Sequence, residues 1–320
     1  MCLILFIFLF MGNVYGDKTV EELRKDISNI NTDSSYSEPG QIQRTCLSWL
    51  YGKDTYSSNP NVNKFTYEVK SFLENFMSLD KKRINDVNSR EEMLKNAPDL
   101  KSIISQMEET YNYNLRSDEG KQDISEIIKL SKSGLTNMLE DTGSFFEEKG
   151  NNEKITIKKI ELLENALKCY NTTTSIGGNI PEELNKKVSE TKMSFYEDIE
   201  KAGNSVSEGE RYYNETLNNR QMTTIKKATE NYNIAISIYE KHNIPMLSGS
   251  EKYKSYYDAY KDATYKMDEA NKLENELQTS FYMFVGIGAI ILIIIFSTIF
   301  RGLSSYKRDE ERMKITKIFR

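Results

Sequence analysis

The sequence predicts an all-α protein that ends in a long helix continuous with one C-terminal transmembrane helix. Apolar residues recur at helical spacing from Asn63 to Leu277. Five prolines, sixteen glycines and 28% charged residues are not the composition of a β-sandwich, and no Asn-Gly or Asp-Gly pair marks a hairpin. The uncharged run 281–300 has twenty residues, enough helix to cross the roughly 30 Å hydrocarbon core of a bilayer.

The N-terminal run 1–16 predicts a signal peptide. Its apolar core is too short to span a bilayer, and Val14 and Gly16 fit the small-residue rule for cleavage before Asp17. The run contains no Lys or Arg, so an uncleaved short anchor or a buried strand is the alternative.

Residues 17–62 predict a poorly ordered N-terminal segment with short helices. Weak helical spacing places one helix over 20–30, and a polar linker follows over 31–40. A short apolar segment with Cys46 and Trp49 completes this part of the chain.

Residues 63–280 predict a helical ectodomain. Ser89 and Glu92 form a capping-box pattern, and Pro98 fits the first turn of a further helix. Gly143 and Gly150 are expected to mark a frayed helix end. The apolar stripes that predict helices cover, in chain order, 65–76, 100–107, 124–139, 157–170, 184–195 and 225–239.

The last helix is expected to begin near Ser248 or Ser250, either of which suits an N-cap. It contains neither Pro nor Gly before Gly286, inside the apolar run. We therefore expect one continuous rod from about Glu251 into the bilayer.

Two similar helix pairs suggest stacked helical hairpins as an alternative to a bundle. Ala-x-x-x-Tyr pairs at 166–170 and 235–239 each end a helix and are followed by Ile-Pro, at 180–181 and 244–245. This spacing loosely resembles tetratricopeptide units, but the Trp and Gly positions of that motif are missing.

The basic tail 301–320 predicts the orientation in the membrane. It carries seven cations and three anions, and positive residues stay on the cytoplasmic side. Removing these from the chain totals of 43 and 48 leaves 36 cations and 45 anions outside the membrane, a net charge of −9. An acidic ectodomain argues against nucleic acid as a partner.

Two kinds of covalent site are expected outside the membrane. Cys2 would leave with the signal peptide, so Cys46 and Cys169 either form a disulfide or are two unrelated buried thiols. The sequons at Asn171 and Asn214 are candidates for glycosylation.

One helix face has the spacing of a coiled coil. Apolar residues step by four and three from Tyr256 to Leu277, with Glu274 interrupting the pattern. The face packs either against 225–239 as an antiparallel hairpin or against a second copy of the chain. This interaction stripe consists of Tyr253, Tyr256, Tyr257, Tyr260, Ala263, Met267 and Ala270.

The sequence offers no marked catalytic, metal or cofactor site. A single histidine, His242, argues against a histidine-ligated metal and against a Ser-His-Asp triad. Its place at a helix end suggests a role beside the helix dipole. Phosphate-binding glycine motifs and CxxC pairs are absent from the sequence, so we expect a protein that is not an enzyme and needs no cofactor.

These features predict a single-pass surface protein whose helical ectodomain works as a protein-binding or scaffolding stalk. Its partners would be the lipid bilayer and other extracytoplasmic or envelope proteins, with self-association through the interaction stripe. The alternative is a sensory subunit that passes movement of the ectodomain to a cytoplasmic partner.

Overall fold

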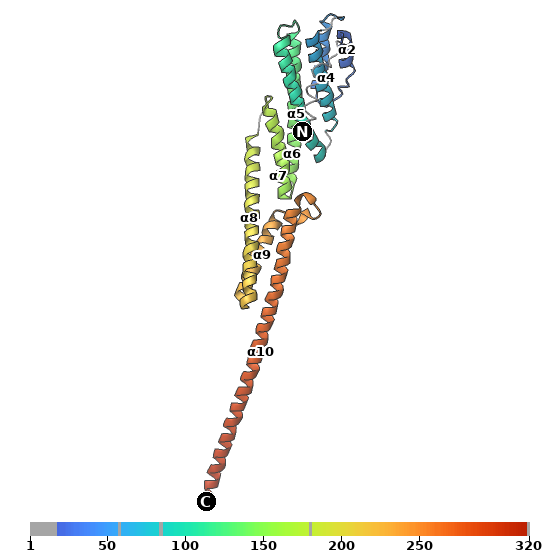
Figure 1. Ribbon diagram of the computed structural model, residues 1–320. Helices are drawn as coiled ribbons and strands as arrows, with labels where there is room; N and C mark the ends of the chain where they lie inside the picture. Colours follow the sequence, from blue (N-terminus) through green and yellow to red (C-terminus); the bar gives the residue numbers. More distant parts are fainter. Residues whose placement is uncertain (1–17, 57–58, 83–85, 179–180, 319–320) are drawn as a thin grey trace, which may run out of the picture. The chain divides into compact units, whose positions relative to one another are not determined.

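The computed structural model describes residues 18–56, 59–82, 86–178 and 181–318, so the expected signal peptide lies outside the described part. Every regular element in the described residues is a helix, which confirms the all-α prediction (Figure 1). The chain divides into two compact units, 1–193 and 194–320, with the boundary inside α8. The elements are α2 (Val20–Ser28), α3 (Glu38–Tyr51), α4 (Pro60–Asp80), α5 (Val87–Thr110), the π-helix η2 (Tyr111–Leu115), α6 (Lys121–Asn152), α7 (Thr156–Thr174), α8 (Glu182–Asn219), α9 (Met222–Lys241), the 3₁₀-helices η3 (Ile244–Leu247) and η4 (Glu251–Tyr253), and α10 (Lys254–Ile318).

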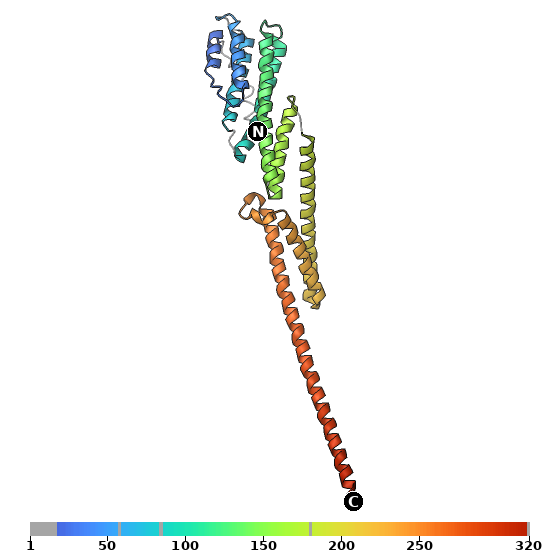
Figure 2. The ribbon, with the colours of Figure 1, turned by 180° about the vertical axis from the view of Figure 1, so that it is seen from behind.

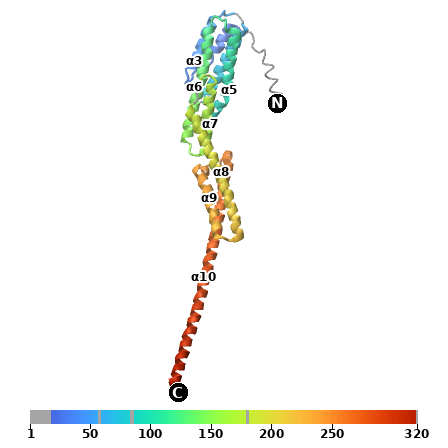
Figure 3. The same ribbon diagram turned by 90° about the vertical axis from the view of Figure 1, so that its left-hand side faces the viewer.

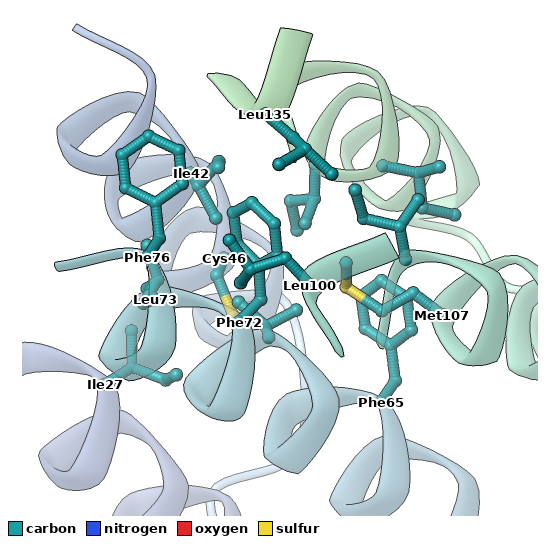
Figure 4. Close-up of a cluster of buried hydrophobic side chains, with 14 of the residues drawn as sticks. Ile27, Ile42, Cys46, Phe65, Phe72, Leu73, Phe76, Leu100, Met107 and Leu135 are labelled. Atoms are coloured by element: carbon teal, nitrogen blue, oxygen red, sulfur yellow. The ribbon is translucent and has the colours of Figure 1, made fainter. Parts of the chain in front are cut away.

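One hydrophobic core joins helices α2 to α6 of the first unit. The apolar stripe of α4 supplies Phe65, Phe72 and Phe76, each fully buried, because these residues share one face of the helix. The Trp49 ring from α3 meets Phe65 edge to face, with ring centroids 5.4 Å apart. The side chains that point toward one another in Figure 4 include Ile27, Ile42, Cys46, Phe65, Phe72, Leu73, Phe76, Leu100, Met107 and Leu135.

Within the segment expected to be poorly ordered, the described residues 18–56 include two short helices that enter the core. Thr19 and Glu22 form a complete capping box at the start of α2, and Ile27 on the same helix is fully buried. Trp49 and its neighbours on α3 enter the same core. Both helices are short, as expected, with nine residues in α2 and fourteen in α3. Isolated helices of this length are marginal in water, so burial against the rest of the unit stabilises them.

Helix α5 also departs from the predicted boundaries. Its N-cap is Asp86, whose carboxylate accepts from the Ser89 backbone N–H at 2.9 Å, so the capping box expected at Ser89 is not used. Pro98 lies inside the helix rather than in a first turn. It sits on the exposed side, where water can satisfy the carbonyl that the missing N–H leaves unbonded.

A second core in the first unit joins α6, α7 and the beginning of α8. Gly143 does not mark a frayed end: it is buried inside α6, and a Cβ there would come within 2.9 Å of the Tyr170 ring. The missing side chain lets α6 and α7 approach closely. The buried residues of this core are Phe146, Leu163, Ala166, Cys169, Tyr170, Leu184 and Val188.

In the second unit, the rest of α8, α9 and the beginning of α10 lie side by side (Figures 1 and 2). Helix α9 matches the predicted stripe 225–239, whereas α8 continues well beyond the predicted 195. A 3₁₀ turn at Glu251–Tyr253 leads into α10, which continues without interruption to Ile318 (Figure 3). The long C-terminal helix expected from about residue 251 is therefore confirmed.

Candidate interaction site

The interaction stripe of α10 packs within its own chain. Ala263 and Ala270 are fully buried, Tyr253 is nearly so, and the remaining four residues are partly exposed. The ring of Tyr260 meets Tyr239 of α9 edge to face, with centroids 6.4 Å apart. Of the two arrangements that the spacing allowed, the structure has the hairpin of α9 and α10.

Helix α8 joins this hairpin and makes a three-helix bundle, which we call the α8–α10 bundle (residues 194–277). Gly209 of α8 is the point of closest approach: a Cβ at this position would lie 2.6 Å from the Tyr232 ring of α9. Only hydrogen at residue 209 leaves room for this buried ring. The buried residues of the bundle core are Ile225, Ala228, Tyr232, Ala270 and Leu273.

Polar contacts tie the three helices of the bundle together. Lys266 of α10 forms ion pairs with Glu210 of α8 and, at 2.6 Å, with Asp262 on its own helix. Burial opposes the charge on Lys266, but the hydrogen bonds to Asp262 and Glu210 outweigh this and raise its pKa. Between α8 and α9, the hydroxyl of Thr216 donates to that of Thr224 at 2.8 Å.

His242 lies at the end of α9, as the sequence indicated, and it belongs to a cluster that the sequence did not reveal. It is the C-cap residue and only 5% exposed, with Nε2 2.9 Å from Asp198 Oδ2. Lys241 contacts the same carboxylate at 2.5 Å, and its hydrogen bond is the main cause that lowers the pKa of Asp198. The Phe195 ring packs edge to face against the His242 ring, with centroids 5.1 Å apart. This arrangement fastens α8 to the end of α9.

The two cysteines are free thiols, which does not support the expected Cys46–Cys169 disulfide. Both are fully buried, but they lie in different cores of the first unit, Cys46 on α3 and Cys169 on α7. Burial raises the pKa of each thiol to about 12, so neither is reactive in the folded protein. The thiols do not meet because each fills a position on the apolar face of its own helix.

The two sequons lie within helices rather than in loops. Asn171 of α7 and Asn214 of α8 are exposed. Their threonines are fully buried: Thr173 donates to the Tyr170 carbonyl at 2.7 Å, and Thr216 belongs to the contact with α9 described above. The threonine hydroxyls thus have structural roles, and glycosylation stays a prediction.

One open surface cleft of the first unit is lined mainly by polar side chains. It has a volume of about 570 Å³ and lies between α5, η2 and α6. Lys132 on one wall of the cleft forms an ion pair with Glu108 on another wall at 2.7 Å, so these two charges compensate each other. Among the described residues, no cluster of His, Cys, Asp and Glu side chains could hold a metal ion.

Beyond the bundle, α10 becomes long and apolar enough to cross a membrane. Its most apolar stretch contains no buried residue. The run 281–300 contains no charge and no buried residue. Such a surface on a helix is typical of contact with lipid.

No protein-family model, curated protein or solved structure matches this chain significantly. Function must therefore be inferred from the geometry of the chain itself.

Proposed function

We propose that this is a single-pass membrane protein whose helical part lies outside the cytoplasm and works as a protein-binding or scaffolding stalk. The observation that carries the proposal is the continuity of α10. The last buried residue of the bundle, Leu273, and the first residue of the apolar run, Phe281, lie on the same helix. Eight residues of helix separate them by about 12 Å.

The proposed orientation rests on charge. Seven cations and three anions follow the apolar run, and the part before it has a net charge of −9. Cations beside a membrane span favour the cytoplasmic side, so the tail would be inside, and the first unit and the α8–α10 bundle outside. This acidic part of the chain would then bind extracytoplasmic or envelope proteins rather than nucleic acid.

Membrane extraction and protease protection test the anchor and its orientation. The full chain should resist alkaline extraction, whereas a chain that ends at Ser280 should be released. Protease added outside should digest the first unit and the α8–α10 bundle and leave a protected fragment that contains 281–320. Release of the full chain by alkali, or protection of the first unit and the α8–α10 bundle from the protease, would contradict the proposal.

Site-specific photo-crosslinking identifies the partner. A photoreactive residue at Tyr265, which is exposed on the bundle portion of α10, should capture extracytoplasmic proteins if the bundle is a stalk. The same probe at Phe284, inside the apolar run, should capture lipid and is the control. If the probe at position 265 captures no protein, this face has no binding role.

A sensory role is the second candidate, favoured by the same continuity of α10. A single helix from the bundle to residue 318 could pass movement across the membrane. In that case a probe at Tyr306, exposed after the apolar run, should capture a cytoplasmic protein. Products only at Tyr265 favour the stalk, and products at both positions favour the sensor.

A further inference from the structure

A carboxyl group is buried in the first unit without the partners that a carboxylate needs. Glu68 of α4 is 3% exposed, and Phe65, Val69 and Phe72, within about one turn of it on the same helix, are fully buried. Its Oε1 accepts a hydrogen bond from the Thr110 hydroxyl at 2.8 Å. Its Oε2 is buried and has no hydrogen-bond partner among the described residues. A carboxylate in this position would keep half of its hydrogen-bonding capacity unsatisfied.

The charges around Glu68 do not compensate its ionisation. Lys64, one turn earlier on α4, is 3.9 Å from Oε1, but its side chain is 41% exposed and therefore screened by water. Glu109 of α5 repels a negative charge at Glu68. Burial is the main cause that raises the pKa of Glu68 to about 7, against the opposing effects of Thr110 and Lys64. Glu68 therefore exchanges its proton near neutral pH.

The hydrogen-bond partner of Glu68, Thr110, lies where α5 ends and a π-helical turn begins. Thr110 is the last residue of α5 and is fully buried, and the π-helical turn η2 begins at the next residue. Within η2, Leu115 is buried, whereas residues 112–114 are exposed. Single π-helical turns are rare and occur frequently at functional positions. The Thr110 hydroxyl thus ties the start of this turn to α4.

We propose that Glu68 is a proton-operated latch: as a neutral acid it holds Thr110 and the η2 turn against α4, and as a carboxylate it releases them. The ionised group must reach water or gain donors, because a buried unpaired charge is costly. Helix α4 is fixed by Phe65 and Phe72 in the core, so the η2 turn, in which residues 112–114 are exposed, is the part that yields. The latch closes in acid and opens as the pH rises.

The sign of the pH effect follows from the raised pKa. The ordinary pKa of a glutamate, 4.5, applies to Glu68 in the open turn. Below this pH the carboxyl is protonated in both the closed and the open turn, and the latch has its full strength. Between 4.5 and about 7 only the open turn loses the proton, so closure weakens as the pH rises. Above about 7 the closed turn loses the proton as well, so the balance between the closed and the open turn no longer changes with pH.

Hydrogen exchange of the full chain in detergent micelles tests the latch. The measured quantity is the protection factor of the 110–115 amides, corrected for the intrinsic effect of pH on exchange. From about pH 6 to about pH 8 it should fall about tenfold, since opening is linked to the loss of one proton. A wild-type protection factor that does not change with pH would overturn the proposal.

Matched variants connect the effect to one carboxyl group. Glu68→Gln keeps an acceptor for Thr110 and cannot ionise, so its protection factors should not depend on pH. Glu38→Gln is the control: Glu38 is also buried, but Asn137 and Ser133 donate to it, so the pH effect at 110–115 should remain. If Glu68→Gln does not fold, Glu68→Met offers a neutral side chain of similar length. A wild-type pH effect that persists in a folded variant at position 68 would refute the latch.

Discussion

Asp118 shows how a single side chain can join distant parts of the first unit. Its Oδ1 accepts from the Trp49 indole N–H at 3.2 Å, from Lys53 at 2.5 Å and from the Gly120 backbone N–H at 2.7 Å. Burial alone would raise the pKa of this carboxyl, but the hydrogen bonds from Lys53, Gly120 and Trp49 outweigh it and lower the pKa. The carboxylate therefore connects the end of α3 to the start of α6.

We expect Asp118→Asn to destabilise the first unit by roughly 1–3 kcal/mol at neutral pH, because the charge-assisted hydrogen bonds are lost. A lowered folded-state pKa stabilises above the unfolded value and loses this effect as the pH falls through the folded value. The difference from wild type should therefore narrow in acid. Trp49, the single tryptophan and buried in this unit, reports its unfolding by fluorescence.

The control for Asp118→Asn is Asp99→Asn, at an exposed position on α5. It should change the stability by no more than about 0.5 kcal/mol. Equal effects of the two substitutions would show that the contacts of Asp118 contribute nothing to the stability of the first unit.

The cysteines provide a second test at this scale. We expect neither Cys46 nor Cys169 to react with an alkylating reagent in the folded chain, since both are buried and their pKa values are raised to about 12. After denaturation without a reductant, mass spectrometry should find both thiols labelled. Labelling that requires a reductant would restore the disulfide and contradict the structure.

At the scale of helices, the α8–α10 bundle depends on a few close approaches. Gly209 and Gly203 both lie within α8, but they differ in surroundings. A Cβ at Gly209 would meet the Tyr232 ring at 2.6 Å, whereas a Cβ at Gly203 would meet nothing within 4 Å. The two positions therefore separate the effect of packing from the effect of helix propensity.

We expect Gly209→Ala to destabilise the second unit by about 1–3 kcal/mol, because the Tyr232 ring is buried and has little room to move. Gly203→Ala should stabilise the same unit by about 0.5–1 kcal/mol through helix propensity. Hydrogen exchange of the α9 amides measures both effects. Stabilisation by both substitutions would show that α8 and α9 are not in close contact.

Periodicity predicted the helices better than the contacts between them. The stripes 65–76 and 225–239 coincide with α4 and α9, because burial of one face imposes the helical period on sequence. Pro98 does not begin a helix as predicted, since an exposed proline can be accommodated inside one. The packing of α2 and α3 could not be predicted from their weak spacing, because short helices gain their stability from distant partners.

The candidate site was predictable only where it lies on one helix. The spacing of the interaction stripe identified the buried face of α10, including Ala263 and Ala270. The partners Asp198 of His242 and Thr110 of Glu68 are more than forty residues away in sequence, and no local pattern marks such a pair. For the two cysteines, the expected location outside the cytoplasm suggested a disulfide, but in the structure Cys46 and Cys169 are free and buried.

At the scale of the whole molecule, α10 is the element that would link the bundle to a membrane. It continues for 65 residues from the buried stripe through the apolar run. A straight helix transmits both position and rotation along its length, so the stalk and the sensor both depend on its continuity. Leu277 still packs against the bundle core, but residues 278–281 are exposed, so hydrogen bonds within the helix keep this short stretch straight.

We expect Asn275→Pro to break this link. Residue 275 is exposed, so the change acts on the backbone: the proline removes one hydrogen bond and clashes with the preceding turn, at a cost of about 3 kcal/mol. Spin labels at Lys261 and Ser280, both exposed, should be about 28 Å apart along a continuous helix. The parent chain in bilayers should give one narrow distance distribution, and Asn275→Pro a broad or shifted one.

Asn275→Ala separates the loss of the side chain from the loss of the backbone hydrogen bond, and it should keep the narrow distribution of the parent. If Asn275→Pro weakens capture of partners at Tyr265 as well as broadening the distribution, the position of the bundle above the membrane matters for binding. If binding persists with a broken helix, the α8–α10 bundle binds as an independent module and α10 is only a tether. A broad distribution in the parent itself would mean that α10 is not continuous in a bilayer, and then neither a rigid stalk nor a mechanical sensor could be built on it.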